Sequence, residues 1–242
     1  MIKHAVVLAI GNPVHHSQLT YNRPPAMLPA LGKPLVARIM DRIRRATDIR
    51  HFIVVLGENE GEVASYLNDH WVPDVSIEFL LKFGRDTLRD VLTKIADKID
   101  APFLVTGYNS FTHPQFYTSL INEHNQSPEW LILGGAAHTL SRSERQYSAQ
   151  YITQNDNVIQ HIDEQLQASE NSVYLANVAA CGKQFLQHLR ETRIDPHEAE
   201  SWMGIVKVYL REHRAKVAET SWTLQTDSDE DLLTLHRHLL DE

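Results

Sequence analysis

The chain has 242 residues, of which 43% are hydrophobic, and it carries a formal net charge of −8 at pH 7. An acidic chain of this kind lacks the basic surface that binding along a phosphate backbone requires, so we expect no nucleic-acid partner. Its length and apolar content suffice for one buried core and no linker rich in Gly, Pro or Ser divides it, so residues 1–242 are predicted to form a single domain.

Membrane and secretory features are missing from the sequence. No stretch reaches the roughly 18 apolar residues of a spanning helix, and the chain starts on an apolar strand rather than a signal peptide. We therefore expect a cytoplasmic protein without a membrane partner. Cys181 is the one cysteine, which excludes an internal disulfide. Its place at the end of an apolar strand favours a buried core residue over a nucleophile.

The first predicted elements are a buried strand and a helix. Residues 5–9 form a short, β-branched apolar run that leads into Gly11, which is typical of a parallel strand followed by a loop. The helix predicted over residues 35–46 has one apolar face, formed by Leu35, Ile39, Met40 and Ile43. A strand, a long loop and a helix in this order are typical of a nucleotide site.

Strands and helices alternate along the rest of the chain. Further strands are predicted near residues 52–56, 77–81, 103–106, 130–134, 158–163, 173–178 and 215–220. This alternation predicts an α/β fold of three layers, α/β/α, with a mostly parallel mixed sheet. A nucleotide would then bind at the carboxyl ends of the first strands.

The segment from residue 8 to residue 34 resembles, without a gap, the signature LAAGxGTRLxPLTxxxPKPMLPVxGKP of sugar-phosphate nucleotidylyltransferases. The matching positions are Leu8, Ala9, Gly11, Leu19, Thr20, Pro24, Met27, Leu28, Pro29, Gly32, Lys33 and Pro34. The resemblance implies the Rossmann-like GT-A fold of nucleotide-diphospho-sugar transferases. It also implies that Ala9, Gly11 and Lys33 face a nucleotide.

Three positions of this signature depart from the family. Pro13 replaces a loop glycine, His15 replaces an arginine and Pro25 replaces a lysine. Proline has a fixed φ and no N–H, so a backbone donor to phosphate is lost at residue 13. His15 is the one remaining candidate for a catalytic group here, and it is mostly neutral at physiological pH. The cations that neutralise a triphosphate in the family are therefore few.

The resemblance continues through the middle of the chain. FGRDTLRDVL is similar to the GRNTAPA stretch of mannose-1-phosphate guanylyltransferases, which implies that Gly84 and Arg85 lie near a base or sugar. APFLVTGYNSF resembles the strand ending in GDN, whose aspartate holds magnesium, but Tyr108 occupies that position. Tyr108 either stacks on a base or caps the strand as a half-buried aromatic residue.

The last third of the chain supplies three further expected site residues. Glu164 matches the family EKP motif, although Gln165 replaces its lysine, and Asn177 matches the asparagine of NAG. By resemblance both would bind substrate. Asp227 falls where cytidylyltransferases place a metal-binding aspartate, and a helix-capping or helix-dipole role explains it equally well.

Three functional classes follow from these residues. The first is a nucleotidyltransferase-like domain, catalytically weak or inactive, that acts as a pseudoenzyme by binding a nucleotide, a nucleotide-sugar or a protein partner. The second is an active magnesium-dependent nucleotidylyltransferase that releases pyrophosphate, with magnesium as its only cofactor. The third is a scaffold without a ligand. The first is preferred, because several charge-stabilising groups are replaced together.

Assembly is the last expectation. A family member without catalytic groups would be retained for what it holds together, so a homodimer or a complex with an active relative is expected. Apolar and aromatic residues that would form such an interface, or else complete the core, are Trp71-Val72-Pro73, Phe111, Phe116 and Tyr117.

Overall fold

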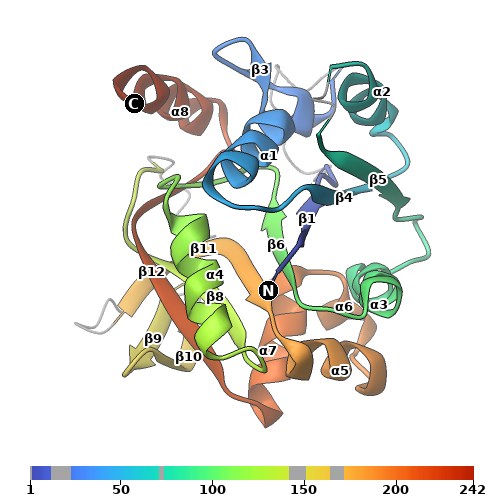
Figure 1. Ribbon diagram of the computed structural model, residues 1–242, viewed down its shortest axis with the longest axis vertical. Helices are drawn as coiled ribbons and strands as arrows, with labels where there is room; N and C mark the ends of the chain where they lie inside the picture. The colour runs from blue at the N-terminus through green and yellow to red at the C-terminus, as the bar shows by residue number, and fades with distance from the viewer. Residues whose placement is uncertain (1, 12–22, 71–73, 142–150, 164–171) are drawn as a thin grey trace.

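The computed structural model describes residues 2–11, 23–70, 74–141, 151–163 and 172–242. The described strands form a ten-stranded sheet with a main order β5-β4-β1-β6-β11-β8-β12-β10-β9, in which β7 pairs with β12 (Figure 1). Their bounds are β1 His4–Leu8, β4 His51–Leu56, β5 Ser76–Leu81, β6 Phe103–Gly107, β7 Ser110–Thr112, β8 Leu131–Thr139, β9 Tyr151–Asn155, β10 Val158–Asp163, β11 Ser172–Cys181 and β12 Ala215–Gln225.

Strand direction makes the sheet mixed. β1 pairs in parallel with β4 on one side and with β6 on the other, and β4 pairs in parallel with β5. β11 runs antiparallel to both β6 and β8, while β8 and β12 are parallel to each other. The predicted three-layer α/β/α fold with a mixed sheet is therefore confirmed, with β11 as the reversed strand in its centre.

Alternating side chains of the central strands supply two separate cores. Val7 and Leu104 belong to one cluster of buried residues, whereas their neighbours Val6 and Val105 belong to the other. This division follows from the period of two in a β-strand, because both faces of the sheet are covered. Buried parallel strands therefore read as continuous apolar runs.

The helices divide between the same two faces. The first core takes side chains from α1, α2, α4 and α8, and the second from α3, α5 and α7. Their bounds are α1 Leu35–Ala46, α2 Gly61–His70, α3 Leu88–Ile99, α4 Phe116–Gln126, α5 Lys183–Glu191, α7 Trp202–Glu212 and α8 Asp229–Asp241; the short helices are η2 Pro25–Met27 and α6 Pro196–Ala199.

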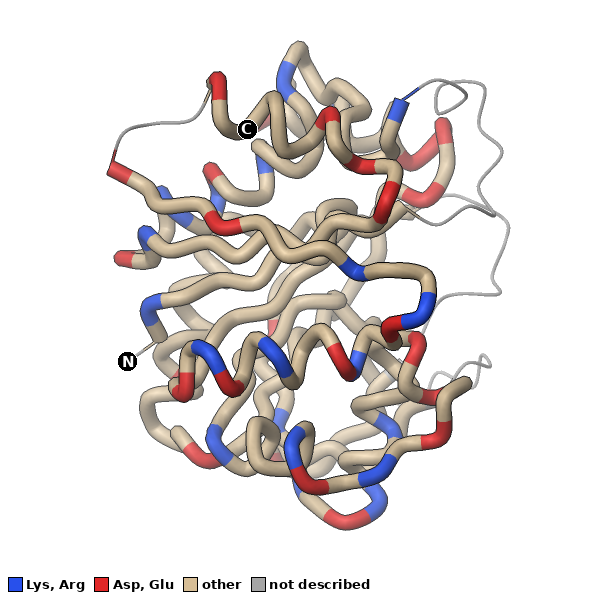
Figure 2. Tube along the Cα trace, turned by 90° about the vertical axis from the view of Figure 1, so that its right-hand side faces the viewer, with Lys and Arg blue, Asp and Glu red and all other residues tan. Residues whose placement is uncertain are grey.

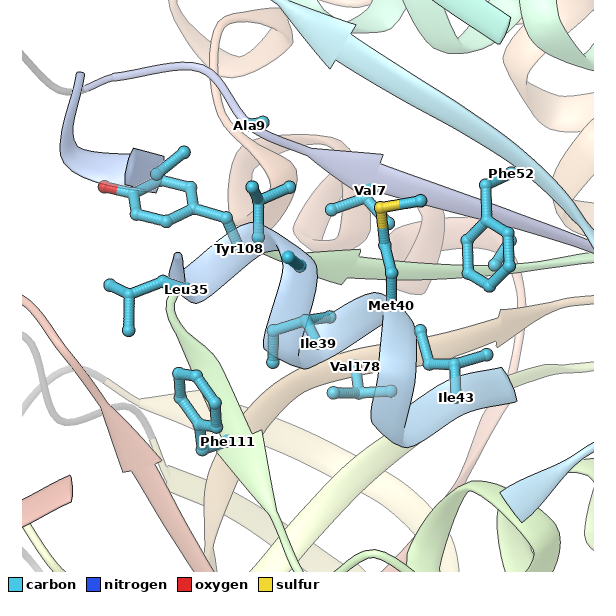
Figure 3. Packing of buried hydrophobic residues seen from close by; sticks show 14 of the residues in the cluster. Val7, Ala9, Leu35, Ile39, Met40, Ile43, Phe52, Tyr108, Phe111 and Val178 are labelled. Atoms are coloured by element: carbon cyan, nitrogen blue, oxygen red, sulfur yellow. The ribbon is translucent and has the colours of Figure 1, made fainter. Parts of the chain in front are cut away.

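Helix α1 shows how the apolar face predicted from sequence is used. Leu35, Ile39, Met40 and Ile43 have no exposed surface, and Figure 3 shows them directed into the first core beside Val7 and Phe52. The helix follows a short hairpin of β2 (Pro29–Ala30) and β3 (Lys33–Pro34). Leu31 and Gly32 have φ of 46° and 77° at its turn, and glycine meets this left-handed conformation without steric cost.

The strands predicted from sequence are all present, but the shorter pairings were missed. β7 has three residues, and β2 and β3 have two each, which is too few to show an alternating pattern. β9 was also missed. Cys181 has no exposed surface, so its assignment to the core is confirmed, and burial raises the pKa of its thiol.

The aromatic residues considered for an interface lie in the core wherever the structure describes them. Phe111 and Tyr117 have no exposed surface and Phe116 is 3% exposed, so the core alternative is confirmed for these three. Residues 71–73, which include Trp71, lie outside the described residues. A homodimer or a complex with a relative stays a prediction, without support from these side chains.

Two surface properties bear on partners. None of the helices in the described ranges is both long and apolar enough to cross a membrane. On the face formed by β5 and α3, acidic and basic residues are interspersed (Figure 2). That face therefore does not present a field of one sign. The expected absence of nucleic-acid partners stays a prediction.

Stability should fall in mild acid because of a buried histidine. His124 in α4 is 1% exposed, and burial lowers the pKa of His124 below its ordinary value of about 6.5. Below that pH the unfolded chain binds a proton that the folded chain excludes, so stability decreases as the pH falls through about 6.5. We expect the unfolding free energy of His124→Gln, measured by urea titration, to vary less over this range than that of the wild type. The exposed His70→Gln should keep the wild-type slope, and an equal slope in both variants would contradict the assignment.

Candidate functional site

A cleft of about 1080 Å³ opens where β1 and β6 end. Its described lining includes Gly11 after β1, Tyr108 and Asn109 after β6, Asn177 in β11 and Asp227 after β12. The carboxyl ends of neighbouring parallel strands meet at one edge of a sheet, so residues far apart in sequence come together here. Asn177 lies between Leu175 and Ala179, where the pairing of β11 with β8 is irregular.

A carboxylate occupies the start of the first loop. The backbone N–H of Gly11 donates to Oε1 of Glu60 at 3.0 Å, and Glu60 is 8% exposed. A Cβ at Gly11 would lie 2.8 Å from the same Oε1, so a side chain here would displace the carboxylate. Oε2 of Glu60 is buried without a hydrogen-bond partner among the described residues. In a phosphate-binding loop this backbone N–H would donate to a phosphate. Here the N–H of Gly11 donates to the carboxylate of Glu60 instead.

Tyr108 continues the pairing of β1 with β6 at the edge of the cleft. Its backbone N–H donates to the carbonyl oxygen of Leu8 at 3.1 Å, and the residue is 8% exposed. Figure 3 shows its ring beside Leu35 within the first core. Burial raises the pKa of the Tyr108 phenol, and the nearby carboxylates of Asp227 and Glu60 raise it further. Tyr108 is thus a neutral residue that caps the end of β6.

Asp227 is held by a neighbouring turn. The side-chain amide of Asn109 donates to Oδ1 of Asp227 at 2.6 Å, and the N–H of Thr226 donates to the carbonyl of Asn109 at 3.0 Å. The alternative that Asp227 caps α8 is wrong, because Ser228 is the N-cap and its Oγ accepts from the N–H of Asp231 at 3.1 Å. Asp227 lines the cleft, and its helix-dipole role one residue before the N-cap of α8 stays a prediction.

The described residues do not fit a resident magnesium ion. By the resemblance, the ion would be held at the positions of Tyr108 and Asp227. A neutral phenol is a poor ligand for a hard cation, so the two positions together offer one carboxylate, that of Asp227. Within the described ranges, Asp227 is not part of any cluster of three potential metal ligands.

Sequence reasoning missed two lysines in this cleft. Lys82 follows β5 and pairs with Glu200 at 3.3 Å, and Lys207 lies in α7; both contribute to the lining. Lys82 could have been found from its position directly after a predicted strand. Lys207 could not, because only the fold turns its helix toward the cleft.

The N-terminus of α7 completes the cleft wall. Ser201 caps the helix by accepting from the N–H of Gly204 at 3.0 Å. A Cβ at Gly204 would lie 2.0 Å from the carbonyl oxygen of Glu198, so only glycine permits this approach to α6. The cleft thus combines two lysines and a helix N-terminus with the carboxylates of Glu198, Glu200 and Asp227.

The other predicted site residues that the structure describes do not line the cleft. Ala9 is fully buried in the first core, and Lys33 forms an ion pair with Asp41 of α1. Gly84 and Arg85 are exposed but do not line the cleft, and the N–H of Gly84 donates to Glu58 at 2.9 Å. Their predicted nucleotide contacts stay predictions. His15 and Glu164, with Pro13, lie outside the described residues.

Comparison with known proteins finds the following similarities. A family described as Nucleotidyl transferase matches residues 4–187. The bifunctional protein GlmU of Methanocaldococcus jannaschii is 20% identical over 239 residues, which are 98% of this chain and 54% of that protein. The chain therefore spans about half the length of this relative.

Solved structures share the fold across nearly the whole chain. A UDP-glucose pyrophosphorylase complexed with UDP-glucose has a TM-score of 0.78 at 16% identity, covering 100% of this chain and 99% of that one. UTP-bound UGPase from Acinetobacter baumannii has a TM-score of 0.77 at 14% sequence identity, and the match covers 100% of this chain and 95% of that one. The inositol-1-phosphate CTP transferase from T. maritima has a TM-score of 0.73 at 18% sequence identity, and the match covers 97% of this chain and 95% of that one.

Proposed function

The chain belongs to the nucleotidyl transferase family, and from that premise we propose that it binds a nucleotide or nucleotide-sugar in the cleft and transfers nucleotidyl groups weakly or not at all. The ligand class is supported by fold neighbours that hold UDP-glucose and UTP. It is also supported by the size of the cleft, about 1080 Å³, which matches the upper range of small-molecule sites.

The hydrogen bond between Gly11 and Glu60 is the main observation that supports the proposed loss of transfer activity. Transfer to an acceptor needs donors aimed at the charge that develops on the phosphate, and removal of one such donor costs about 10²–10³ in rate. Here the Gly11 N–H is engaged at 3.0 Å by a carboxylate, which would also repel a triphosphate. Tyr108 stands where the family supplies a metal-binding carboxylate. Although such losses do not add, each acts on the same transition state.

An active transferase is the second candidate, and the two lysines favour it. Lys82, Lys207 and the N-terminus of α7 provide positive charge in the cleft that the first loop no longer provides. In this reaction a phosphate oxygen of the acceptor attacks the α-phosphorus of a nucleoside triphosphate, the bond to the β-phosphate oxygen breaks, and pyrophosphate leaves. The lysines would bind the anionic substrates and orient them.

Ligand binding and turnover should be measured on the same protein. We expect UTP, CTP, UDP-glucose or another common nucleotide or nucleotide-sugar to raise the melting temperature, since a ligand of the native state stabilises it by mass action. With the same triphosphates, sugar phosphates and magnesium, pyrophosphate release should stay at the level of the enzyme-free blank. An active relative assayed in parallel shows that the assay detects turnover.

Two outcomes would overturn the proposal. Magnesium-dependent pyrophosphate release that is lost in Asp227→Asn but kept in Glu230→Gln would identify an active enzyme, because Glu230 is an exposed acid of the same segment. No stabilisation by any ligand, confirmed by titration calorimetry, would identify a scaffold without a ligand.

A further inference from the structure

A cluster of two histidines and a glutamate lies at the ends of two helices. His188 is in α5, Glu212 is the last residue of α7, and His213 follows it as the C-cap. One ligand atom from each of the three lies within 4.8 Å of the other two. Helices α5 and α7 pack against each other through Phe185 and Tyr209, whose rings are 5.3 Å apart, and both lie at the lower edge of Figure 1.

His188 has the hydrogen-bonding pattern of a metal ligand. It is 2% exposed, and its Nδ1 lies 3.1 Å from Oγ1 of Thr192. The tautomer with its proton on Nδ1 donates a hydrogen bond to this hydroxyl, which leaves the lone pair on Nε2 and fixes the ring. Nε2 is buried without a hydrogen-bond partner among the described residues. An unpaired polar atom in a buried position costs free energy, and a bound cation would remove that cost.

Neighbouring aromatic rings hold both imidazoles in place. Tyr209 stacks on His213 with a centroid distance of 4.7 Å and meets His188 edge-on at 5.2 Å. The two imidazoles are themselves 5.4 Å apart and perpendicular. The rings are therefore oriented by packing rather than free to turn, which is what a preformed ligand pair requires.

The charges around the cluster favour a cation on balance. Glu212 contributes a carboxylate, and α7 ends at this point with the negative end of its dipole. Arg89 opposes a cation, but its guanidinium is turned toward the carbonyls of Leu189 and Thr192, at 2.7 and 2.8 Å.

We propose that His188, Glu212 and His213 form a binding site for a divalent transition metal of the Zn²⁺ class. Two imidazoles and one carboxylate are a known zinc ligand set, and they leave a fourth position for water. Ligands around tetrahedral Zn²⁺ lie about 3.4 Å apart, given bonds of about 2.0–2.1 Å. Movement of the exposed Glu212 side chain and small displacements of the two packed imidazoles would bring the ligand atoms from within 4.8 Å of one another to this separation.

The proposed site would act on the cleft through one helix. Ser201 and Gly204 at the start of α7 line the cleft, and Glu212 and His213 at its end form the cluster. A helix of 11 residues is about 16 Å long, so the ion would not reach the cleft. It would instead join the ends of α5 and α7 and hold in place the helix whose start forms the cleft wall.

Titration of the full chain, without an affinity tag and after treatment with a chelator, tests this proposal. Calorimetry should show one Zn²⁺ bound per chain, with a rise in melting temperature, and no comparable heat with Mg²⁺, which prefers oxygen ligands. Loss of an outer partner typically costs 10–100-fold in metal affinity, so His213→Ala and Glu212→Gln should each weaken Zn²⁺ by about 100-fold or more. Both residues are at least partly exposed, so these variants keep the fold even if His188→Ala does not.

The chain has 14 histidines, so the controls must exclude binding elsewhere. His70→Ala, on an exposed face of α2, and the double variant His15→Ala with His16→Ala should bind Zn²⁺ as the wild type does. Binding that is unchanged in both His213→Ala and Glu212→Gln, or that disappears in the double variant instead, would overturn the proposal. So would the absence of a stoichiometric site.

Discussion

Gly182→Ala is expected to lower the free energy of unfolding by about 3 kcal/mol, the upper part of the range for inserting an atom into a packed site. Gly182 is the N-cap of α5, and a Cβ there would lie 2.2 Å from the carbonyl oxygen of Trp130 and 2.7 Å from the carbonyl carbon of Glu129. Both are backbone atoms. The N–H of Gln184 also donates to the carbonyl of Glu129 at 3.0 Å, so the helix cannot withdraw without losing a hydrogen bond.

Gly61→Ala is the matched control for this substitution. Gly61 begins α2, is exposed, and has no atom within 4 Å of an added Cβ. Alanine there reduces the freedom of the unfolded chain and favours the helix, so stability should be unchanged or rise by up to about 1 kcal/mol. Urea unfolding of the two variants measures the difference directly. Equal stability of Gly182→Ala and the wild type would contradict the prediction, because it would mean that the backbone of Glu129 and Trp130 moves away from the added Cβ at little cost.

Glu60→Gln is expected to tighten binding of UDP-glucose by about 10- to 100-fold. A unit charge about 6 Å from a phosphate contributes roughly 2–3 kcal/mol at an effective dielectric constant of about 20, and exposure of the cleft reduces this figure. The amide keeps an oxygen that can accept from the Gly11 N–H, so the loop start retains its support while the negative charge is removed. Calorimetric titration of wild type and variant gives the ratio.

Glu62→Gln separates the local effect from the change in net charge. Glu62 lies on the exposed first turn of α2, two residues after Glu60, and its removal changes the total charge by the same amount. UDP-glucose affinity should stay at the wild-type value in Glu62→Gln. An equal gain in both variants would assign the effect to net charge, and a loss in Glu60→Gln would mean that the carboxylate organises the site rather than repels the ligand.

The fold was predictable because its elements are specified locally. The β-branched run of residues 5–9 and the apolar face of residues 35–46 each report burial within one element, and both are buried as predicted. Strand order across the sheet was not predictable in the same way. β11 pairs with β6 and β8 across long stretches of chain, and no local pattern records that it is reversed.

The site residues that could be named from the sequence are those that match a family motif. Gly11, Tyr108, Asn177 and Asp227 follow from the resemblance and line one cleft. Glu60 was missed because its carboxylate reaches Gly11 across 49 residues of sequence. The ion pair of Lys33 with Asp41, an acid two turns along the helix that follows it, was also missed, and the expected nucleotide contact of Lys33 stays a prediction. Contacts made by long side chains depend on the folded geometry, which the motif alone does not contain.

The position of β12 inside the sheet has a consequence for the time at which the protein can fold during synthesis. β12 lies between β8 and β10, and it is complete only when residue 225 has been translated, 86 positions after β8 ends at residue 139. At about 5–20 residues per second this interval lasts roughly 4–17 s. Throughout it the edge of β8, which includes the buried residues Leu131, Ile132 and Leu133, has no partner on that side. The nascent chain therefore exposes the apolar edge of β8 for seconds before β12 can pair with it. This is the interval in which chaperones would act on the chain.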